Sequence, residues 1–591
     1  MPGFIIHTGC KPFELAPETR KRLVVERIDK DNFFVERRVV NKFMNDRVFL
    51  DLEDYSVIVE GVVLNNHELM NKYASSSWVG CIVKMYESEG EAFFNAFRGS
   101  FSGALHDKKA DKWIVYTGHT GEKQVFFAQV PGGFLFGSEM RFMVGALKQN
   151  GLPVTLDKTG CYLSLTHGFC IEDRTLVSEI HKLIAGHYLR LTKNGLEDIQ
   201  YHRFSNKPNT EISEEEAIEG IDRLFRQAIK RQFEKDREYG YQHIACLSGG
   251  LDSRMTVWVA HQMGYTDQTN IDFSQSGYLD FTVSQQIAID LHHDYFFHPL
   301  DGGDFIPRYR FNSEITYGSG FLMGHGYSLE KIIDYEPFGI MHTGQIGDSI
   351  IGTFFKKNEY NTEVGLGQGA YSQVLLDRLA DYRFVETYEN EEIFCLYTRA
   401  FTGANQGLLT FQENTESYSP FTDVDFLEYC YSIPLNLRYK HKIYIDWILQ
   451  KYPKAGEYVW EKTAKPLSPV ENRVPRYMAI GGYRIPHITD PAFPEYLKGF
   501  VLRRLGIRKK EGKGHSIRLA DKNNMNPVDY WYETNPSIRA FVESFWKDNC
   551  SQVPDSDLSH DMSILVSQDA VFDKLQCLNV LSAILEITKK D

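Results

Sequence analysis

The sequence predicts three successive regions: an α+β layered domain, an α/β domain with a doubly wound parallel sheet, and a mainly helical C-terminal extension. Residues 1–205 contain short β-branched and aromatic runs separated by turn signals, which is typical of layered sheets. Residues 206–470 alternate strand and helix patterns, which favours a parallel sheet. Residues 471–591 show mainly helical spacing. The length of 591 residues agrees with this division, since domains commonly contain about 100–200 residues.

The composition narrows the class of protein. With 42% hydrophobic and 24% charged residues, the chain fits neither a disordered nor a fibrous class. The formal net charge of −14 argues against nucleic acid as a partner, because nucleic-acid binding depends on neutralising phosphates. The nine cysteines form no CxxC pair, which disfavours zinc ribbons and disulfide frameworks. Because no signal-peptide pattern and no apolar run of about 18 residues is found, we expect a cytoplasmic enzyme without a membrane partner.

The first region alternates strand patterns with occasional helical patches. Turn signals containing glycine, proline or asparagine separate several of the strands. Strands are expected at 33–35, 57–64, 113–117, 125–129 and 133–137, and helices at 67–74 and 139–149.

The second region begins with a loop at 206–212 and a helix that runs to about residue 235. Ser213 and Glu216 form a capping-box pattern at the start of this helix. Two strand–helix pairs follow, with strands at 243–247 and 269–273 and helices at 252–263 and 280–291. This order predicts parallel strands joined by helical crossovers.

The strongest chemical signal is the segment Ser248-Gly249-Gly250-Leu251-Asp252-Ser253, which joins the first of these strands to its helix. Glycine lets a backbone approach a ligand closely, and free N–H groups at a helix start attract anions. A carboxylate at the mouth of an anion site repels phosphate unless a cation lies between them, so Asp252 points to Mg²⁺. The segment is not the Walker A pattern, because no GK[ST] follows.

This segment resembles the pyrophosphate loop of ATP pyrophosphatases, and the chain as a whole resembles the asparagine synthetase family, which includes β-lactam synthetase. The resemblance covers roughly residues 1–470. It implies an Ntn-like αββα sandwich, then an adenine nucleotide α-hydrolase-like sheet that cleaves ATP to AMP and pyrophosphate. It rests on 97–105, 121–127, 134–139, 175–187, 248–253, 344–348, 420–423 and 433–434.

The N-terminal domain departs from the family where the family cleaves glutamine. The family's nucleophile is a cysteine next to the initiator methionine, with its own α-amine as the base. Here Pro2 precedes Gly3, and proline has no thiol. The family's N-G-E-I-Y-N segment, whose first Asn helps to hold glutamine, reads E-G-V-V-L-N at 60–65. We therefore expect a 1–205 domain that does not hydrolyse glutamine.

The segment Gly344-Gln345-Ile346-Gly347-Asp348 resembles the family's second acidic loop. The resemblance makes Asp348 the second Mg²⁺ carboxylate, opposite Asp252, and assigns Gly344 to the nucleotide site. Gln345 occupies a catalytic position that holds Glu in asparagine synthetase and Tyr in β-lactam synthetase. Because glutamine cannot act as a base, amine activation is expected to differ here.

The resemblance extends the site to four further positions. Glu416 aligns with a glutamate that helps to deprotonate the amine in the β-lactam branch, although a loop carboxylate without a catalytic role fits equally. Lys462 would neutralise charge on the departing pyrophosphate, and the register also allows Lys465. Ser274 and Leu247 would contact adenine.

The sequence predicts an ATP- and Mg²⁺-dependent, AMP-forming carbon–nitrogen ligase that joins a carboxylate to an amine without glutamine hydrolysis. Two alternatives remain: an intramolecular cyclase of the β-lactam or lasso-peptide type, and a degenerate nucleotide-binding regulatory protein. Sulfur transfer to tRNA is disfavoured, because the cysteine pairs or zinc knuckles it needs are missing. The extension 471–591 resembles proteins of cell-surface polysaccharide clusters, which favours a sugar carboxylate over another small-molecule or peptide carboxylate. Whether the chain forms a homodimer stays open.

Overall fold

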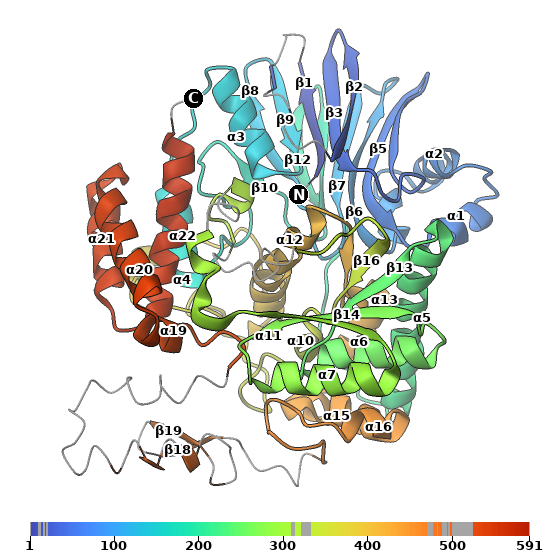
Figure 1. The fold of residues 1–591 in the computed structure, drawn as a ribbon. Helices are drawn as coiled ribbons and strands as arrows, with labels where there is room; N and C mark the ends of the chain where they lie inside the picture. The colour runs from blue at the N-terminus through green and yellow to red at the C-terminus, as the bar shows by residue number, and fades with distance from the viewer. Residues whose placement is uncertain are drawn as a thin grey trace.

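The computed structural model describes residues 2–9, 14–15, 18, 22–308, 314–320, 332–469, 477–480, 483–486, 488, 493–494, 497–498, 501 and 524–589. Two six-stranded sheets form the N-terminal part (Figure 1). The first has the order β10-β8-β9-β1-β3-β2 and the second the order β12-β11-β7-β6-β5-β4. The strands are β1 (Gly3–Thr8), β2 (Leu23–Lys30), β3 (Phe33–Val40), β4 (Val48–Asp51), β5 (Tyr55–Val63), β6 (Gly99–Asp107), β7 (Lys112–Thr117), β8 (Phe126–Val130), β9 (Gly133–Gly137), β10 (His181–Lys182), β11 (His187–Thr192) and β12 (Gly195–Gln200).

These two sheets are stacked between helices. Phe4 and Ile6 of the first sheet share a buried cluster with Ile58 and Ala104 of the second. The outer face of the second sheet packs against α1 (Asn66–Lys72) and α2 (Trp78–Glu89), and that of the first against α3 (Met140–Gln149) and α4 (Lys158–His167). Helix, sheet, sheet and helix therefore form four layers. All five strands predicted in this region are present, but β1, β2, β4, β6, β10, β11, β12 and the helices α2 and α4 were missed.

The second region contains a parallel five-stranded sheet with the order β15-β14-β13-β16-β17. Its strands are β13 (Gln242–Cys246), β14 (Gln268–Ser274), β15 (Asp294–Pro299), β16 (Phe338–His342) and β17 (Ser417–Tyr418). Helices α5 (Glu214–Tyr239), α6 (Leu251–Gln262) and α7 (Leu279–Leu291) connect and cover the first strands. The capping box is confirmed: the Ser213 side chain accepts from the Glu216 amide, and the Glu216 carboxylate accepts from the Ser213 amide.

Shorter helices complete this domain, and the described residues of the extension add further helices. The former are α10 (Gly347–Ile351), α11 (Glu391–Cys395), α12 (Leu409–Gln412), α13 (Val424–Ser432), α14 (Leu435–Arg438), α15 (Lys442–Lys451) and α16 (Pro453–Gly456). The latter are α19 (Val528–Thr534), α20 (Pro536–Asn549), α21 (Ser556–Ser567) and α22 (Val571–Thr588), and a hairpin, β18 (Tyr477–Ile480) and β19 (Tyr483–Pro486), precedes them. Of the extension that was predicted to be helical, residues 502–523 lie outside the described residues.

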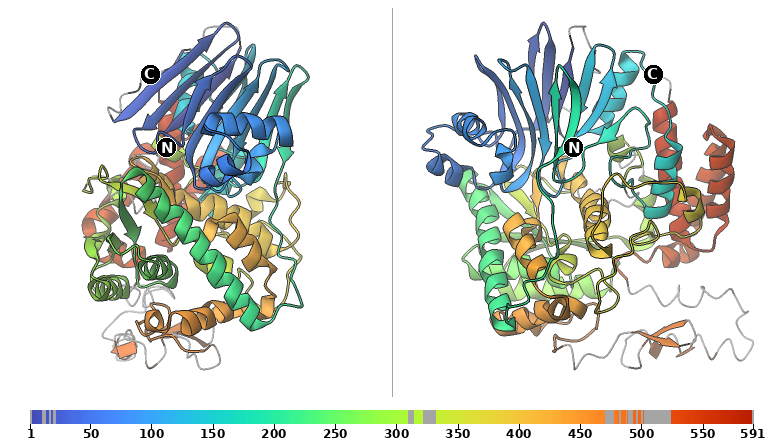
Figure 2. Two further views of the ribbon diagram at one scale, coloured as in Figure 1. Left: turned by 90° about the vertical axis from the view of Figure 1, so that its right-hand side faces the viewer. Right: turned by 180° about the vertical axis from the view of Figure 1, so that it is seen from behind.

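The extension does not stand apart from the rest of the chain. Its last helix, α22, contacts α4 of the N-terminal part, and both contribute to one hydrophobic core (Figure 2). Trp531 of α19 is fully buried in that core. Among the helices that the structure describes, none combines the length and apolarity needed to cross a membrane.

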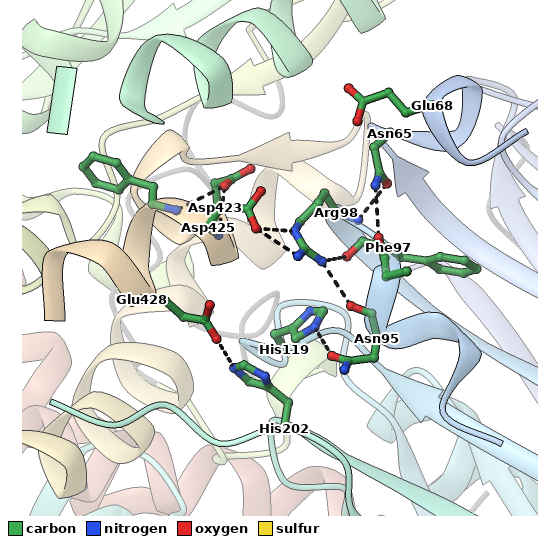
Figure 3. A network of polar contacts seen from close by, with 12 residues as sticks. Asn65, Glu68, Asn95, Phe97, Arg98, His119, His202, Asp423, Asp425 and Glu428 are labelled. Atoms are coloured by element: carbon green, nitrogen blue, oxygen red, sulfur yellow. Dashed lines mark hydrogen bonds and ion pairs between the residues drawn. The ribbon is translucent and has the colours of Figure 1, made fainter. Parts of the chain in front are cut away.

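A charged interface joins the N-terminal sheets to the second domain (Figure 3). Arg98 donates to Oδ1 of Asp425 on α13 at 2.9 Å, and Arg231 of α5 donates to Oδ2 of the same carboxylate at 2.9 Å. His202 lies 3.6 Å from Glu428 on α13. Burial lowers the pKa of His202 to about 4, so this histidine is neutral near pH 7. In this network the positive charge is therefore carried by the guanidinium groups of Arg98 and Arg231 and not by His202.

Candidate active site

A cavity of about 460 Å³ opens at the carboxyl edge of the parallel sheet. It lies between the segments that follow β13 and β16 and includes Leu247 and Thr343 in its wall. The chain crosses from β13 to β14 on one side and reaches β16 on the other, so the strand order reverses at this point. Open α/β sheets bind ligands at such a switch point, beyond the carboxyl ends of the strands.

The loop between β13 and α6 is held by its own side chains. The Ser248 amide donates to Ser253 Oγ at 2.9 Å, and the Gly250 amide donates to Ser248 Oγ at 3.2 Å. The Gly249 amide donates to Oδ1 of Asp280 at 2.9 Å. Gly250 is the N-cap of α6 and provides no side-chain cap, so the first amides of this helix face the cavity region without a capping side chain. This arrangement suits an anion such as a phosphate group.

The second acidic loop reaches the first because two of its residues are glycine. A Cβ at Gly344 would lie 2.2 Å from the Ser253 nitrogen, and one at Gly347 would lie 2.7 Å from Cγ of Asp252. Ile346 between them has a φ of 62°, a left-handed conformation that is costly for a β-branched residue and often occurs at functional sites. Any larger side chain at Gly344 would therefore separate the two loops.

The two predicted metal carboxylates come together at this contact. The Asp348 amide donates to Oδ2 of Asp252 at 2.9 Å, and the Tyr444 hydroxyl donates to Oδ1 at 2.8 Å. The Lys462 ammonium lies 3.1 Å from Oδ2 of Asp348. Lys462, rather than the alternative Lys465, lines the cavity.

The charges at this point are unevenly balanced. Burial, with the nearby Asp348 carboxylate, raises the pKa of Asp252 to about 7. Burial also acts to raise the pKa of Asp348, but Lys462 and His441 together bring it below its usual value. Lys462 therefore offsets the charge of Asp348, whereas burial keeps disfavouring the ionised form of Asp252. The oxygens of both carboxyl groups fit Mg²⁺, whose charge would favour the ionised form of Asp252.

Three further carboxyl groups line the cavity. Burial raises the pKa of Asp272 and of Glu461 to about 8 each, and that of Asp280 to about 6. Glu461 was missed in the sequence analysis, although it stands beside Lys462. Tyr444 and His441 were also missed, because no local motif marks them.

Most of the predicted site residues lie together. The cavity wall includes Leu247, Ser248, Gly250, Leu251, Asp252, Ser253, Gly344, Gln345, Asp348 and Lys462. Gly249 is bonded to the cavity residue Asp280. Ser274 is fully buried at the end of β14 and is not part of the wall, which instead contains its neighbours Asp272 and Phe273.

Gln345 forms hydrogen bonds through both its side chain and its backbone. Its side-chain amide donates to the Ala404 carbonyl, and its own carbonyl accepts from the Ser419 hydroxyl at 2.9 Å. Residues 404 and 406–411 form one wall of the cavity. Gln345 therefore attaches this wall to the second acidic loop.

Glu416 does not lie with the other predicted residues, which corrects the prediction that it acts as a base. Its carboxylate accepts from Arg47 at 2.6 Å and lies 2.9 Å from Lys123, both in the N-terminal domain. Arg47 also lies 3.2 Å from Glu60. Burial acts to raise the pKa of Glu416, but Lys123 and Arg47 outweigh it and lower the pKa. Glu416 directly precedes β17 and lies at the domain interface, where its carboxylate forms ion pairs with the N-terminal domain.

A second group of buried side chains has the composition of a metal site but lies away from the cavity. Oδ2 of Asp236 is 2.8 Å from His243 Nδ1 and 2.8 Å from His342 Nε2. Oδ1 of Asp236 accepts from the Ile340 amide at 2.8 Å. These hydrogen bonds account for the buried charge of Asp236 without an ion and connect α5 to β13 and β16.

Comparisons with known proteins match two separate segments of the chain. A glutamine amidotransferase domain model matches residues 48–202, and an asparagine synthase model matches residues 220–311. Asparagine synthetases 3 and 2 of Bacillus subtilis are 25% identical over 219 residues and 26% identical over 287 residues, which are 35% and 45% of this chain. Amidase chyE of Penicillium rubens is 25% identical over 190 residues, 31% of this chain. The chain is thus asparagine synthetase-like.

These matches are partial. They span 26% of the amidase and 34% and 37% of the two synthetases. Among solved structures, a glutamine phosphoribosylpyrophosphate amidotransferase from B. subtilis matches 45% of this chain and 52% of its own, with a TM-score of 0.22 and 8% identity. A likeness of that size carries no argument about the site.

Proposed function

We propose that this protein is an ATP-dependent, AMP-forming amide-bond synthetase that adenylates a substrate carboxylate and passes the acyl group to an amine. The single observation that carries the proposal is the cavity itself. It combines an open helix start after Gly250, the paired carboxylates Asp252 and Asp348, and the ammonium group of Lys462. The asparagine synthase match over 220–311 covers the first of these elements.

The reaction has two steps. An oxygen of the substrate carboxylate attacks the α-phosphorus of ATP, the bond from that phosphorus to the bridging oxygen breaks, and pyrophosphate leaves with the electron pair. The amine nitrogen then attacks the carbonyl carbon, the bond to the AMP oxygen breaks, and the nitrogen loses a proton. The products are an amide and AMP.

Each group in the cavity has a role in these steps. The amides at the start of α6 and the hydroxyls of Ser248 and Ser253 would hold the pyrophosphate. Asp252 and Asp348 would hold Mg²⁺, which supplies positive charge against the phosphate oxygens when bound. Lys462 is placed to neutralise charge on the leaving group. Leu247 and Phe273, beyond β13 and in β14, offer apolar surface to the base.

Independence from glutamine is part of the proposal. Pro2, directly before β1, is buried and has no nucleophilic side chain. Gly3 packs so closely that a Cβ there would lie 2.0 Å from Ser138 Oγ. Glu60, at the first position of the family's glutamine-holding segment, is occupied by an ion pair with Arg47 at 3.2 Å. Nitrogen would therefore come from ammonia, from a separate amine, or from the substrate itself.

The test is to incubate the protein with ATP, Mg²⁺ and a panel of small-molecule, peptide and sugar carboxylates. AMP and pyrophosphate should form with one member of the panel, and mass spectrometry should identify the acylated product. A product lighter than its acid by one water, formed without added amine, would indicate ring closure. The proposal fails if no carboxylate elicits AMP and if Asp252→Asn leaves the affinity for Mg²⁺–ATP unchanged.

A further inference from the structure

Arg254 is a fully buried cation next to residues 248–253, the segment at the start of α6 that is called the anion loop below. It lies on α6, two residues after Asp252, and its side chain is inaccessible to solvent. The guanidinium donates to the Gly249 carbonyl of the loop at 2.8 Å. It also donates to the carbonyls of Ala455 at 3.0 Å, Tyr458 at 3.3 Å and Val459 at 2.7 Å.

All four of these acceptors are backbone carbonyls. Within the described residues, no carboxylate accepts a hydrogen bond from Arg254. Arg231 shows the usual arrangement, because its guanidinium donates to the carboxylates of Asp423 and Asp425 at 3.0 and 2.9 Å. Burying a charge without a direct counter-ion is costly, and burial lowers the pKa of Arg254 to about 10. The ionised forms of Glu461 and Asp280, which line the cavity, act in the opposite direction and raise this pKa.

The four carbonyls belong to two segments that are distant in sequence. Gly249 is in the anion loop, while 455–459 is the end of α16 and the turn that leads into Glu461 and Lys462. Lys462 in turn lies 3.1 Å from Asp348. One planar guanidinium therefore sets the spacing between the loop that would hold pyrophosphate and the lysine that would neutralise it. Lysine offers three donors around a single point and cannot reproduce this fork.

We infer that Arg254 is a positioning residue for the leaving pyrophosphate: it fastens the Lys462 segment to the anion loop and places a buried positive charge behind that loop. The inference rests on the proposed function. Arg254 is not part of the cavity wall, and its two terminal nitrogens donate to backbone carbonyls rather than to a ligand. A buried charge in a low-dielectric interior acts on a nearby phosphate more strongly than one in water.

The experiment measures ATP–pyrophosphate exchange by the full-length protein with an accepted carboxylate. Arg254→Gln removes the charge and the fork, while Arg254→Lys keeps the charge alone. We expect kcat to fall about tenfold or more in Arg254→Gln, with a smaller change in KM for ATP, since hydrogen bonds to charged groups contribute on that scale. The kcat of Arg254→Lys should lie between those of the wild type and Arg254→Gln. In Arg254→Ala, added guanidinium below its denaturing concentration should restore part of the exchange.

Arg231→Lys is the matched control, because it alters a mostly buried arginine of the same domain that is remote from the cavity wall. Its melting temperature should fall without a loss of kcat for the folded protein. The inference is overturned if Arg254→Lys melts as the wild type does and keeps the wild-type kcat, or if guanidinium restores nothing to a folded Arg254→Ala. If the wild type itself shows no exchange, the proposed function fails. The affinity of the Arg254 variants for Mg²⁺–ATP then decides the inference, with unchanged affinity overturning it.

Discussion

The backbone amide of Asp348 donates a 2.9 Å hydrogen bond to Oδ2 of Asp252, although 96 positions separate the two residues. The bond joins the turn after β16 to the turn after β13, which are neighbouring parallel strands. Two carboxylates from separate loops thereby face one cavity at a fixed spacing.

Gly344→Ala should abolish most of the adenylation activity while Gly365→Ala leaves it intact. At Gly344 a Cβ would lie 2.2 Å from the Ser253 nitrogen, whereas at Gly365 nothing lies within 4 Å. The first substitution therefore pushes Asp348 away from Asp252, and the second only tests the effect of an added methyl group. Pyrophosphate release at saturating Mg²⁺–ATP measures the difference. Equal rates in the two variants would show that the contact between the loops is not required.

Glu416→Gln should destabilise the protein without removing a catalytic step. The substitution leaves Arg47 and Lys123 facing a neutral amide in a buried cluster, and breaking such a pair costs about 3–5 kcal/mol. Urea unfolding measures the loss, and amide formation per folded molecule should stay close to the wild-type rate. If the variant is as stable as the wild type but forms the acyl-adenylate without passing it to an amine, Glu416 is the base after all.

Asp272→Asn should make the protein relatively more stable as the pH rises. Burial holds the pKa of Asp272 near 8 in the folded state, far above the usual value in an unfolded chain. Between about pH 4 and 8 the unfolded chain releases this proton and the folded protein retains it, so the wild type loses stability as the pH rises. Asp272→Asn has no carboxyl group at this position, so it should not lose stability in this way.

The measurement is the free energy of unfolding at pH 5 and at pH 8. The difference between the variant and the wild type should shift by at least about 1 kcal/mol in favour of the variant, because one pKa unit corresponds to about that energy. Asp267→Asn makes the same substitution at an exposed position and serves as the comparison. An identical pH profile for Asp272→Asn and the wild type would contradict the pKa assigned to Asp272.

Glutamine should supply no nitrogen to the product. Pro2 stands where the family has its nucleophile, and Glu60, in the family's glutamine-holding segment, is paired with Arg47. In reactions with amide-¹⁵N glutamine the label should be absent from the product, and unlabelled ammonium or the accepted amine should sustain turnover. Transfer of the label, or release of glutamate at the rate of AMP formation, would refute independence from glutamine.

Features that depend on residues close together in the sequence could be predicted, whereas features that depend on distant contacts could not. Ser213 and Glu216 are three residues apart, and their capping box is present as predicted. The strand, loop and helix around Ser248–Ser253 also appear within about one residue of the predicted bounds. Short strands such as β4 and β12 were missed, because only pairing with neighbouring strands stabilises them.

The sequence by itself determined the local chemistry of this protein: an anion loop at the start of α6, an acidic loop at 344–348, and a proline in front of Gly3. Such features arise from residues a few positions apart, whose geometry backbone sterics dictate. Only the tertiary structure decided that Glu416 pairs with Arg47 rather than facing the cavity, that Glu461 and Tyr444 join the site, and that Arg254 bonds to 455–459. The hydrogen bonds of Glu416, Tyr444 and Arg254 join residues about 200 or more positions apart. They depend on the order in which five parallel strands pack, and local spacing in the sequence does not encode that order.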